Sequence, residues 1–488
     1  MLEERLKEKC AIFGIFSHPD AGNLTSLALH AMQHRGQESS GIISIEENEI
    51  KEEIIEMGLV EDIFTDKKIK TLKGDMAIGH NRYSTSGESN LQDSQPLRIN
   101  DNGTLVIAHN GTLYNYEKLK KKLEEEGFLF ETTADTEVIP YLINKSNKNS
   151  LVERIIEALS EVEGAYSLVL TNKNKLIGVR DPNGFRPLVL GEIEGSFVLA
   201  SETTALDLIN ANFVRNIRPG EIVSISKKDP EKSNEMILET LQFADPNPSC
   251  CVFEQLYFGW PNSLIISDKD EIIPNAQRRR EFGRQLARET REKNLEFDLV
   301  IPVPESGTHA AEGFAGELNI PLYRSLIKNK QTRTFIEPTD EIRLFGTRLK
   351  YSVVKQDIEG KRVAIVDDTI VRGNTSKKII ELIRGANASE SHLCIPSPPI
   401  TSRCYFGIDI KTEEELIAGI MYEEMLKESH KKTLSLRSPR NIKRLQDKIA
   451  KFNGADSVTY LSIEGLYKVA GENICVGCFT REYPIKVD

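Results

Sequence analysis

The segment 366–376 reads VDDTIVRGNTS and follows the apolar run 363–365 directly. A strand that ends in two carboxylates and then enters a small polar turn before a helix places acids beside unpaired backbone N–H groups. The N–H groups of 372–376 suit a phosphate monoester, because the start of a helix favours an anion. Asp367 and Asp368 would repel that phosphate, so we expect them to face ribose hydroxyls or a magnesium-bound diphosphate. The segment therefore predicts a site for a phosphorylated sugar.

An isolated pair of aspartates would more often cap a helix in an ordinary doubly wound domain. The complete string, with Thr375 and Ser376 at the helix entry, instead resembles the phosphoribosyl diphosphate (PRPP) signature of type I phosphoribosyltransferases. The resemblance implies that PRPP is bound by Asp367, Asp368, Thr369, Arg372, Gly373, Asn374, Thr375 and Ser376.

Two further segments extend this resemblance. The segment 298–307, DLVIPVPESG, is similar to the pyrophosphate loop of the same family, and Ser306 can supply an oxygen to Mg²⁺ together with Asp367 and Asp368. The basic segment 328–336 begins at Lys328, which we expect to contact PRPP when that segment closes over the substrate. Taken alone, either segment would be an ordinary turn or solvated loop.

Composition limits the class of protein. The 488 residues exceed one ordinary core and predict two large domains. A charged fraction of 28% and a hydrophobic fraction of 39% are typical of a globular protein without a membrane span, and the charged start MLEERLKEK does not resemble a signal peptide. The net charge of −11 argues against nucleic acid as a partner. We therefore expect a cytoplasmic enzyme of small metabolites.

The pattern of apolar residues changes along the chain. From Cys10 to about residue 225, short β-rich segments alternate with helical patterns, as expected for sheets with packed helices. The polar segment 227–247, with Pro near both ends, is the predicted linker. After it, helices alternate with fully apolar strands such as 298–302 and 362–366, which indicates a mainly parallel sheet covered on both faces.

Cys10 follows a short charged leader and precedes an apolar strand. If residues 1–9 were removed as a propeptide, the free α-amino group of Cys10 would act as base toward its own thiol. A buried core cysteine is the alternative. Polar clusters at 34–39, 79–85, 108–111 and 133–137 favour the nucleophile, because their order resembles the N-terminal-nucleophile glutamine amidotransferases. The resemblance implies glutamine binding by Arg35, Arg82 and Asp135, and an oxyanion hole of Asn110 and Gly111.

Both halves in this order resemble the glutamine PRPP amidotransferases. The resemblance implies an αββα glutaminase domain at 10–245, a type I phosphoribosyltransferase domain at 246–470 and a cysteine-containing tail at 471–488. It also implies that ammonia passes internally from glutamine to PRPP, that purine nucleotides inhibit by feedback, and that the chain forms a homotetramer. Another N-terminal-nucleophile amidotransferase, or a PRPP-binding regulator without catalysis, is the alternative.

The seven cysteines are too few and too scattered for a disulfide framework in a cytoplasmic chain of this length. The pair in Cys475-Val476-Gly477-Cys478 fits half a zinc site, a redox pair or no metal at all. The family resemblance implies a structural [4Fe-4S] cluster held by Cys251, Cys404, Cys475 and Cys478. Cys250 is expected to be a bystander and Cys394 a core residue.

The segment 257–263, YFGWPNS, departs from the family pattern. The family more often has Arg before the proline and Asp after it, so Trp260 and Asn262 remove two charges. We expect altered regulation here before an altered reaction.

Overall fold

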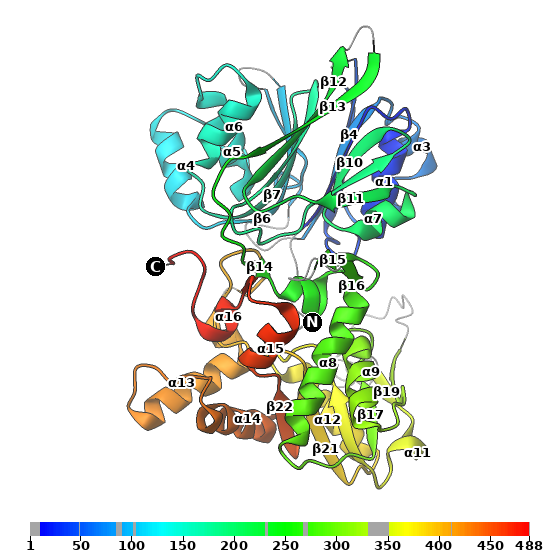
Figure 1. Cartoon of the computed structure of the whole chain (residues 1–488), viewed down its shortest axis with the longest axis vertical. Coiled ribbons are helices and arrows are strands. Elements are labelled where there is room, and N and C mark those ends of the chain that lie inside the picture. Colours follow the sequence, from blue (N-terminus) through cyan, green and yellow to red (C-terminus); the bar gives the residue numbers. More distant parts are fainter. Residues whose placement is uncertain are drawn as a thin grey trace, which may run out of the picture.

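The computed structural model describes residues 10–47, 49–83, 90–100, 104–229, 233–266, 272–329, 351–410 and 412–487. These residues form two lobes stacked along the long axis (Figure 1). The first lobe contains β1 to β13, and the second begins after β13 and ends with the C-terminal residues. In the part of the chain that is described, no helix is both long and apolar enough to cross a membrane.

Two antiparallel sheets face each other in the first lobe. One runs in the order β11-β9-β10-β1-β4-β2-β3 and the other in the order β13-β12-β8-β7-β6-β5. The first sheet consists of β1 (Ala11–Phe16), β2 (Ser39–Glu46), β3 (Glu49–Met57), β4 (Met76–Arg82), β9 (Val189–Ile193), β10 (Ser196–Ala200) and β11 (Asn212–Asn216). The second consists of β5 (Leu97–Asn100), β6 (Thr104–Leu113), β7 (Gly164–Thr171), β8 (Lys175–Arg180), β12 (Glu221–Asp229) and β13 (Ser233–Gln242).

Apolar side chains fill three layers of this lobe. Ile12, Ile43 and Ile78 of one sheet pack with Val106 and Val169 of the other. The outer face of the first sheet packs on α1 (Ala21–Ala31) and α7 (Thr203–Leu208), with α2 (Val60–Ile63) and α3 (Asp66–Ile69) nearby. The outer face of the second sheet packs on α4 (Tyr116–Glu125), α5 (Val138–Lys145) and α6 (Leu151–Leu159). The expected αββα sandwich is confirmed.

The predicted linker at 227–247 is wrong for most of its length. Residues 233–242 form β13, which pairs with β12 from Glu221↔Gln242 to Asp229↔Ser233. Met236 and Leu238 lie two residues apart, on the same face of the strand, and pack against the core between the sheets. A strand at the edge of a sheet has only one buried face, so its sequence remains polar enough to resemble a linker.

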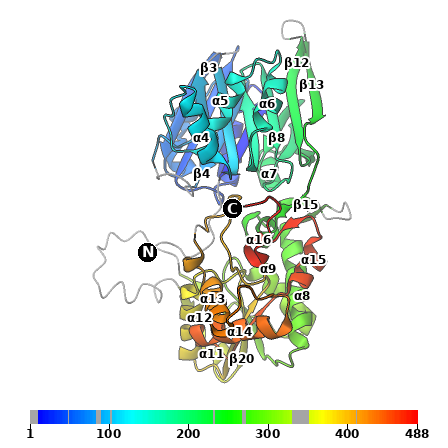
Figure 2. The ribbon, with the colours of Figure 1, turned by 90° about the vertical axis from the view of Figure 1, so that its left-hand side faces the viewer.

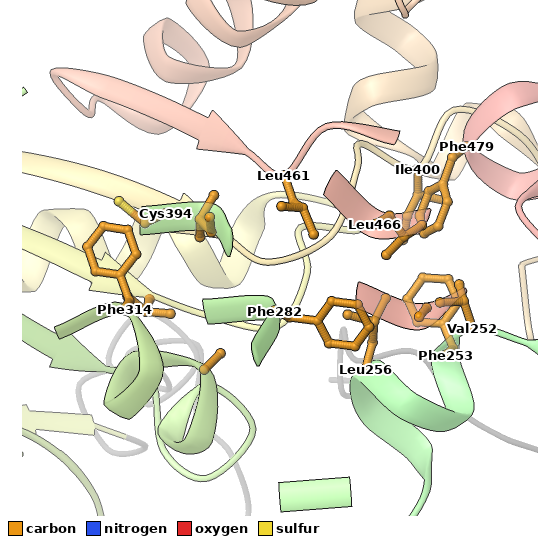
Figure 3. Packing of buried hydrophobic residues seen from close by; sticks show 14 of the residues in the cluster. Val252, Phe253, Leu256, Phe282, Phe314, Cys394, Ile400, Leu461, Leu466 and Phe479 are labelled. Atoms are coloured by element: carbon orange, nitrogen blue, oxygen red, sulfur yellow. The ribbon is translucent and has the colours of Figure 1, made fainter. Parts of the chain in front are cut away.

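A parallel sheet forms the centre of the second lobe. It runs β17-β20-β21-β22, with bounds Leu299–Pro302, Arg362–Val366, Glu390–Ile395 and Ser457–Tyr460. Val300 and Ala364 face α8 (Asn275–Arg291) and α9 (Thr308–Leu318). Figure 3 shows Phe282, Phe314 and Cys394 in the apolar core on this side of the sheet. Leu299, Ile301, Val363 and Ile365 face α12 (Asn374–Gly385), α13 (Ile417–Ser429) and α14 (Pro439–Asn453). Both faces are therefore buried, as the continuous apolar strands predict.

Short elements lie between the lobes or at the edge of the second lobe. The segment after β13 contributes β14 (Cys250–Cys251), the π-helix η2 (Glu254–Phe258), β15 (Leu264–Ile266) and β16 (Ile272–Pro274). The C-terminal segment returns as α15 (Ile463–Ala470), β23 (Ile474–Cys475) and α16 (Gly477–Thr480), and β23 pairs with β14. Figures 1 and 2 place α16 in the second lobe, on the side that faces the first. The edge carries β18 (Leu326–Lys328), β19 (Tyr351–Val353) and α11 (Lys355–Ile358).

Candidate functional site

Cys10 directly precedes β1, the strand between β10 and β4. Its side chain is buried, and its φ of 67° is left-handed. Because Ala11 pairs with Asn81, the register places Arg82 at the end of β4 beside Cys10. The strand order thus brings a thiol and a guanidinium to one end of the first sheet.

A carboxylate that sequence reasoning missed holds Arg82. Arg82 Nη2 lies 3.4 Å from Asp93 Oδ2, and both side chains are buried. Asp93 also accepts hydrogen bonds from the backbone N–H and the hydroxyl of Thr133, at 2.7 and 2.6 Å. No local pattern identifies Asp93, because its partner Thr133 lies forty residues further along the chain.

Asn110 and Gly111 lie in β6, on the second sheet. The Asn110 side chain is fully buried, and neither its Nδ2 nor its Oδ1 has a hydrogen-bond partner among the described residues. An unsatisfied buried amide costs about 1–3 kcal/mol, so such a group calls for an explanation. Gly111 has φ of 149°, and a Cβ there would lie 2.0 Å from the Ala165 carbonyl oxygen. Asn110 is therefore a free donor and acceptor held in a rigid strand.

Two histidines connect the sheets next to these residues. His80 Nε2 lies 3.1 Å from the carbonyl oxygen of His109, which joins β4 to β6 one residue before Asn110. Burial, with a smaller effect of Arg82, lowers the pKa of His80 to about 3, so the ring is neutral at pH 7. The bond brings the Arg82 end of β4 close to the Asn110 region of β6.

Asp135 lies in η1 (Asp135–Glu137), beside the same strand. Its Oδ2 accepts the backbone N–H of Leu113 at 2.9 Å, and its Oδ1 lies 3.8 Å from His109 Nδ1. The structure thus gathers Cys10 and Arg82 on one sheet, and Asn110, Gly111 and Asp135 on or beside the facing sheet. A thiol, an unpaired amide, a cation and an anion in one region can hold and attack an amide substrate that carries both charges.

Arg35 lies elsewhere in the first lobe, at its contact with the second. Its side chain is fully buried and pairs with Glu202 and with Glu254 of η2. Burial alone would raise the pKa of Glu202, but the charges of Arg35 and His34 hold it well below its usual range. In this structure Arg35 is therefore paired with carboxylates of the protein itself. A role for Glu202 or Glu254 at the site was not predicted from the sequence.

The acidic pair of the second lobe follows β20 at the carboxyl edge of the parallel sheet. Asp367 and Asp368 line a pocket with Val303, residues 369–373, Thr375 and Ser376. Ser306 Oγ donates to Asp367 Oδ1 at 3.1 Å, so the two predicted loops meet as expected from parallel strand ends. Arg279 of α8 was missed by sequence reasoning; it is buried, and its charge interacts with that of Asp368.

The turn after the acidic pair leads into α12, which begins at Asn374. Gly373 has φ of 81°, where glycine is favoured. Ser376 Oγ donates to the Gly373 carbonyl oxygen at 3.0 Å and to Asn453 Oδ1 at 2.7 Å, so it stabilises the turn. Thr369 Oγ1 donates to Asp368 Oδ2 at 3.0 Å, and Thr375 lines the pocket.

Of the two predicted cations, Arg372 lines this pocket. Arg372 pairs with Glu415 in η3 (Glu413–Glu415). Lys328 ends β18 and its side chain is exposed. The rest of the basic segment, from 330 onward, lies outside the described residues.

The cysteines of the C-terminal half form a separate group. Cys251 pairs with Cys475 in the β14–β23 ladder, and the Cys478 carbonyl oxygen accepts the N–H groups of Thr401 and Ser402, two residues before Cys404. Burial raises the pKa of Cys475 to about 12 and raises that of Cys251 and Cys478, and the charges of these thiols and of Cys404 interact.

All seven cysteines are free thiols. Within the described ranges, no group of three or more His, Cys, Asp or Glu side chains has the close geometry of a single-ion site. Cys394 is fully buried in the core between the sheet and α8, as expected. Cys250 lies 3.6 Å from Arg180 Nη2.

Both halves of the chain are similar to known protein families. A glutamine amidotransferase domain family matches residues 80–208, and a phosphoribosyl transferase domain family matches residues 271–397. Amidophosphoribosyltransferase 2, chloroplastic, from Arabidopsis thaliana is 41% identical over 99% of this chain and 81% of its own.

Two solved structures are similar over nearly the whole length. The allosteric regulatory enzyme of purine biosynthesis superposes with a TM-score of 0.85, at 37% identity over 98% of this chain and 97% of that one. Glutamine PRPP amidotransferase from B. subtilis, complexed with ADP and GMP, gives a TM-score of 0.84 at 37% identity over 97% of both chains.

Proposed function

The chain belongs to the amidophosphoribosyltransferase family, and on that premise we propose that it makes 5-phosphoribosylamine, diphosphate and glutamate from PRPP, glutamine and water. This is the first committed step of purine synthesis. One observation carries the proposal: a buried thiol and an unpaired buried amide in one lobe, and an acidic PRPP-type pocket in the other, occur in one chain.

In the first lobe, Cys10 is the nucleophile once residues 1–9 have been removed as a propeptide. Asn110 Nδ2 and the Gly111 N–H stabilise the oxyanion, a role that fits an amide buried without a partner. Arg82 binds the glutamine α-carboxylate, Asp135 binds its α-ammonium, and Arg35 contributes when it exchanges its protein carboxylates for substrate.

In the second lobe, Asp367 and Asp368 face the ribose, and the N–H groups of the turn before α12 bind the 5-phosphate. Arg372 and Lys328 approach PRPP from the rim. Ser306, Asp367 and Asp368 present oxygen atoms within one small region, a donor set that fits Mg²⁺. When bound, Mg²⁺ would neutralise the diphosphate that leaves. The ammonia passes internally, because free ammonia is mostly protonated at neutral pH and is then not nucleophilic.

We also propose a [4Fe-4S] cluster held by Cys251, Cys404, Cys475 and Cys478. The fit rests on four buried or half-buried thiols that three separate segments bring together. A four-iron cluster is larger than one ion, so its ligands need not lie as close together as those of zinc. Its role would be structural, joining the C-terminal tail to β14.

The assembly and regulation are carried over from the family. We propose a homotetramer in the cytoplasm that purine nucleotides inhibit, consistent with ADP and GMP in the B. subtilis relative. The net charge of −11 favours small metabolites over nucleic acid as partners, and we propose no membrane partner.

The decisive experiment uses a Cys10→Ala variant. It should abolish synthesis from glutamine, by about 10⁴-fold or more, because the nucleophile is lost. Synthesis from ammonium salts should persist, since the transferase site is intact. Glutamate and diphosphate are measured together for wild type and variant, with PRPP and magnesium. Diphosphate absent from both, with PRPP still bound, would instead favour a regulatory paralogue.

Iron provides a separate test of the cluster. Anaerobically prepared protein should contain iron and acid-labile sulfide in about equal amounts, with the four iron atoms per chain of a [4Fe-4S] centre. Cys478→Ser should lose both, whereas Cys394→Ser should keep both. Wild-type protein without iron would remove the cluster from the proposal.

A further inference from the structure

One set of residues joins the two lobes next to a predicted glutamine ligand. We define the interdomain joint as His34, Arg35 and Glu202 from the first lobe and Glu254, Trp260 and Ser263 from the second. It contains buried charged side chains, and removing a charge from water costs free energy unless a partner of opposite charge compensates.

Glu202 is the centre of the joint. One of its oxygens accepts from Arg35 Nε and lies 2.8 Å from His34 Nε2. The other accepts the Trp260 N–H at 2.7 Å and the Ser263 hydroxyl. A single carboxylate therefore ties the 34–35 loop of the first lobe to the second lobe.

Glu254 makes a second connection to the same loop. It pairs with Arg35 through Oε2 and with Arg186 through Oε1, the latter at 2.9 Å. Both arginine side chains are fully buried. Removing one member of a buried ion pair leaves an uncompensated charge, so Arg35 is strongly fixed by Glu254.

Trp260 makes the third connection. Its indole lies over the His34 ring, with 4.7 Å between centroids, although 47% of the tryptophan is exposed. Because Trp260 is half-exposed, it restrains the His34 ring by packing on it and is not part of an apolar core. Trp260 is also the only tryptophan in the chain.

The joint continues toward the PRPP pocket. Arg279 Nη2 donates to the carbonyl oxygens of Tyr257 and Gly259, and its Nε donates to that of Gln255. Arg279 therefore fixes the π-helix that carries Glu254, and its charge also interacts with that of Asp368. π-helical turns occur frequently at functional sites.

We propose that Glu254 and Trp260 are positioning residues for the use of glutamine: through them the second lobe sets the place of Arg35 and its loop. This inference rests on the proposed glutamine-binding role of Arg35. Neither residue touches the reacting atoms. Losing either should impair the use of glutamine and spare the use of ammonia.

The first test is Glu254→Gln, which keeps shape and removes charge. The KM for glutamine should rise about tenfold while ammonium-dependent synthesis stays within about twofold of wild type. Glu296→Gln is the matched control, because Glu296 is an exposed partner of Arg362 far from the joint. An unchanged or lower KM would overturn the positioning role of Glu254.

The second test concerns Trp260. Trp260→Ala should raise the KM for glutamine severalfold, and Trp260→Phe should restore it, because phenylalanine can still pack on His34. Equal values for both variants and wild type would overturn the role of Trp260. Since the side chain is half exposed, neither change removes core packing.

The third test needs no turnover. In a Cys10→Ala variant, which binds glutamine without hydrolysing it, adding glutamine should change the emission of Trp260. With one tryptophan, any change reports on the joint; constant emission at saturating glutamine would contradict the inference. The proposed function fails differently, by absence of both glutamine-dependent and ammonium-dependent synthesis in the wild type.

Discussion

Most of the residues proposed for the glutaminase site lie on or next to strands of two facing sheets, whereas those proposed for PRPP lie mainly on loops at the edge of one sheet. In the first site, Asn110 is buried with no partner among the described residues, on the rigid strand β6. In the second, the polar groups pair with one another, as Ser306 does with Asp367 and Arg372 with Glu415. Asn110 is therefore held ready by its strand, whereas Ser306 and Arg372 must exchange internal contacts for substrate.

The loop site gives the largest effect expected on both nitrogen sources together. Replacing both Asp367 and Asp368 by Asn should reduce synthesis from glutamine and from ammonia by roughly a thousandfold, because charge stabilisation at such sites is worth several kcal/mol. Steady-state diphosphate release measures it. Asp298→Asn is the control at the opposite end of the sheet, where Asp298 pairs with Arg362. Loss of activity with only one nitrogen source would contradict a shared PRPP site.

Asn110 tests preorganisation in the strand site. Asn110→Ala should lower kcat for glutamine hydrolysis by about 10²–10³-fold. Its free energy of unfolding should not fall, because the native amide has no protein hydrogen bond to lose. Asn115→Ala provides the contrast: Asn115 bonds to Glu161 O and Glu163 N, so that variant should lose about 1 kcal/mol and keep activity. Urea denaturation and glutaminase assays compare the two, and a strongly destabilised Asn110 variant would count against preorganisation.

The smallest effect is a pH dependence of stability. The pKa of His80 is lowered to about 3 in the native state, against 6.5 unfolded, so between these values only the unfolded chain binds the proton. The unfolding free energy should therefore fall as pH drops below 6.5, by at most about 1.4 kcal/mol per pH unit. Urea unfolding at several pH values between about 7.5 and about 5 measures this dependence of the unfolding free energy on pH.

His80→Gln removes this titration, so its stability relative to wild type should improve as the pH falls. His30→Gln, at an exposed position of α1, should leave the pH dependence unchanged. Parallel curves for His80→Gln and wild type would refute the assignment.

Local patterns predicted much of both sites, and they failed in identifiable places. The acidic loop, the turn before α12 and the strand containing Asn110 follow from runs of neighbouring residues. The edge strand β13 was interpreted as a linker, because one buried face leaves few apolar residues. Asp93, Glu202, Glu254 and Arg279 were missed, because each acts through a residue distant in sequence.

The sequence by itself determined the αββα and parallel-sheet lobes, the family, and the positions of Cys10, Asn110 and Asp367, because periodicity and motifs are properties of neighbouring residues. Only the tertiary structure decided that the Asn110 side chain has no hydrogen-bond partner among the described residues, and that the cysteines of β14 and β23 lie side by side. It also decided that Arg35 is paired with Glu202 and Glu254. These facts depend on strand register and on how the lobes pack, so segments hundreds of residues apart must come together before the charges can pair.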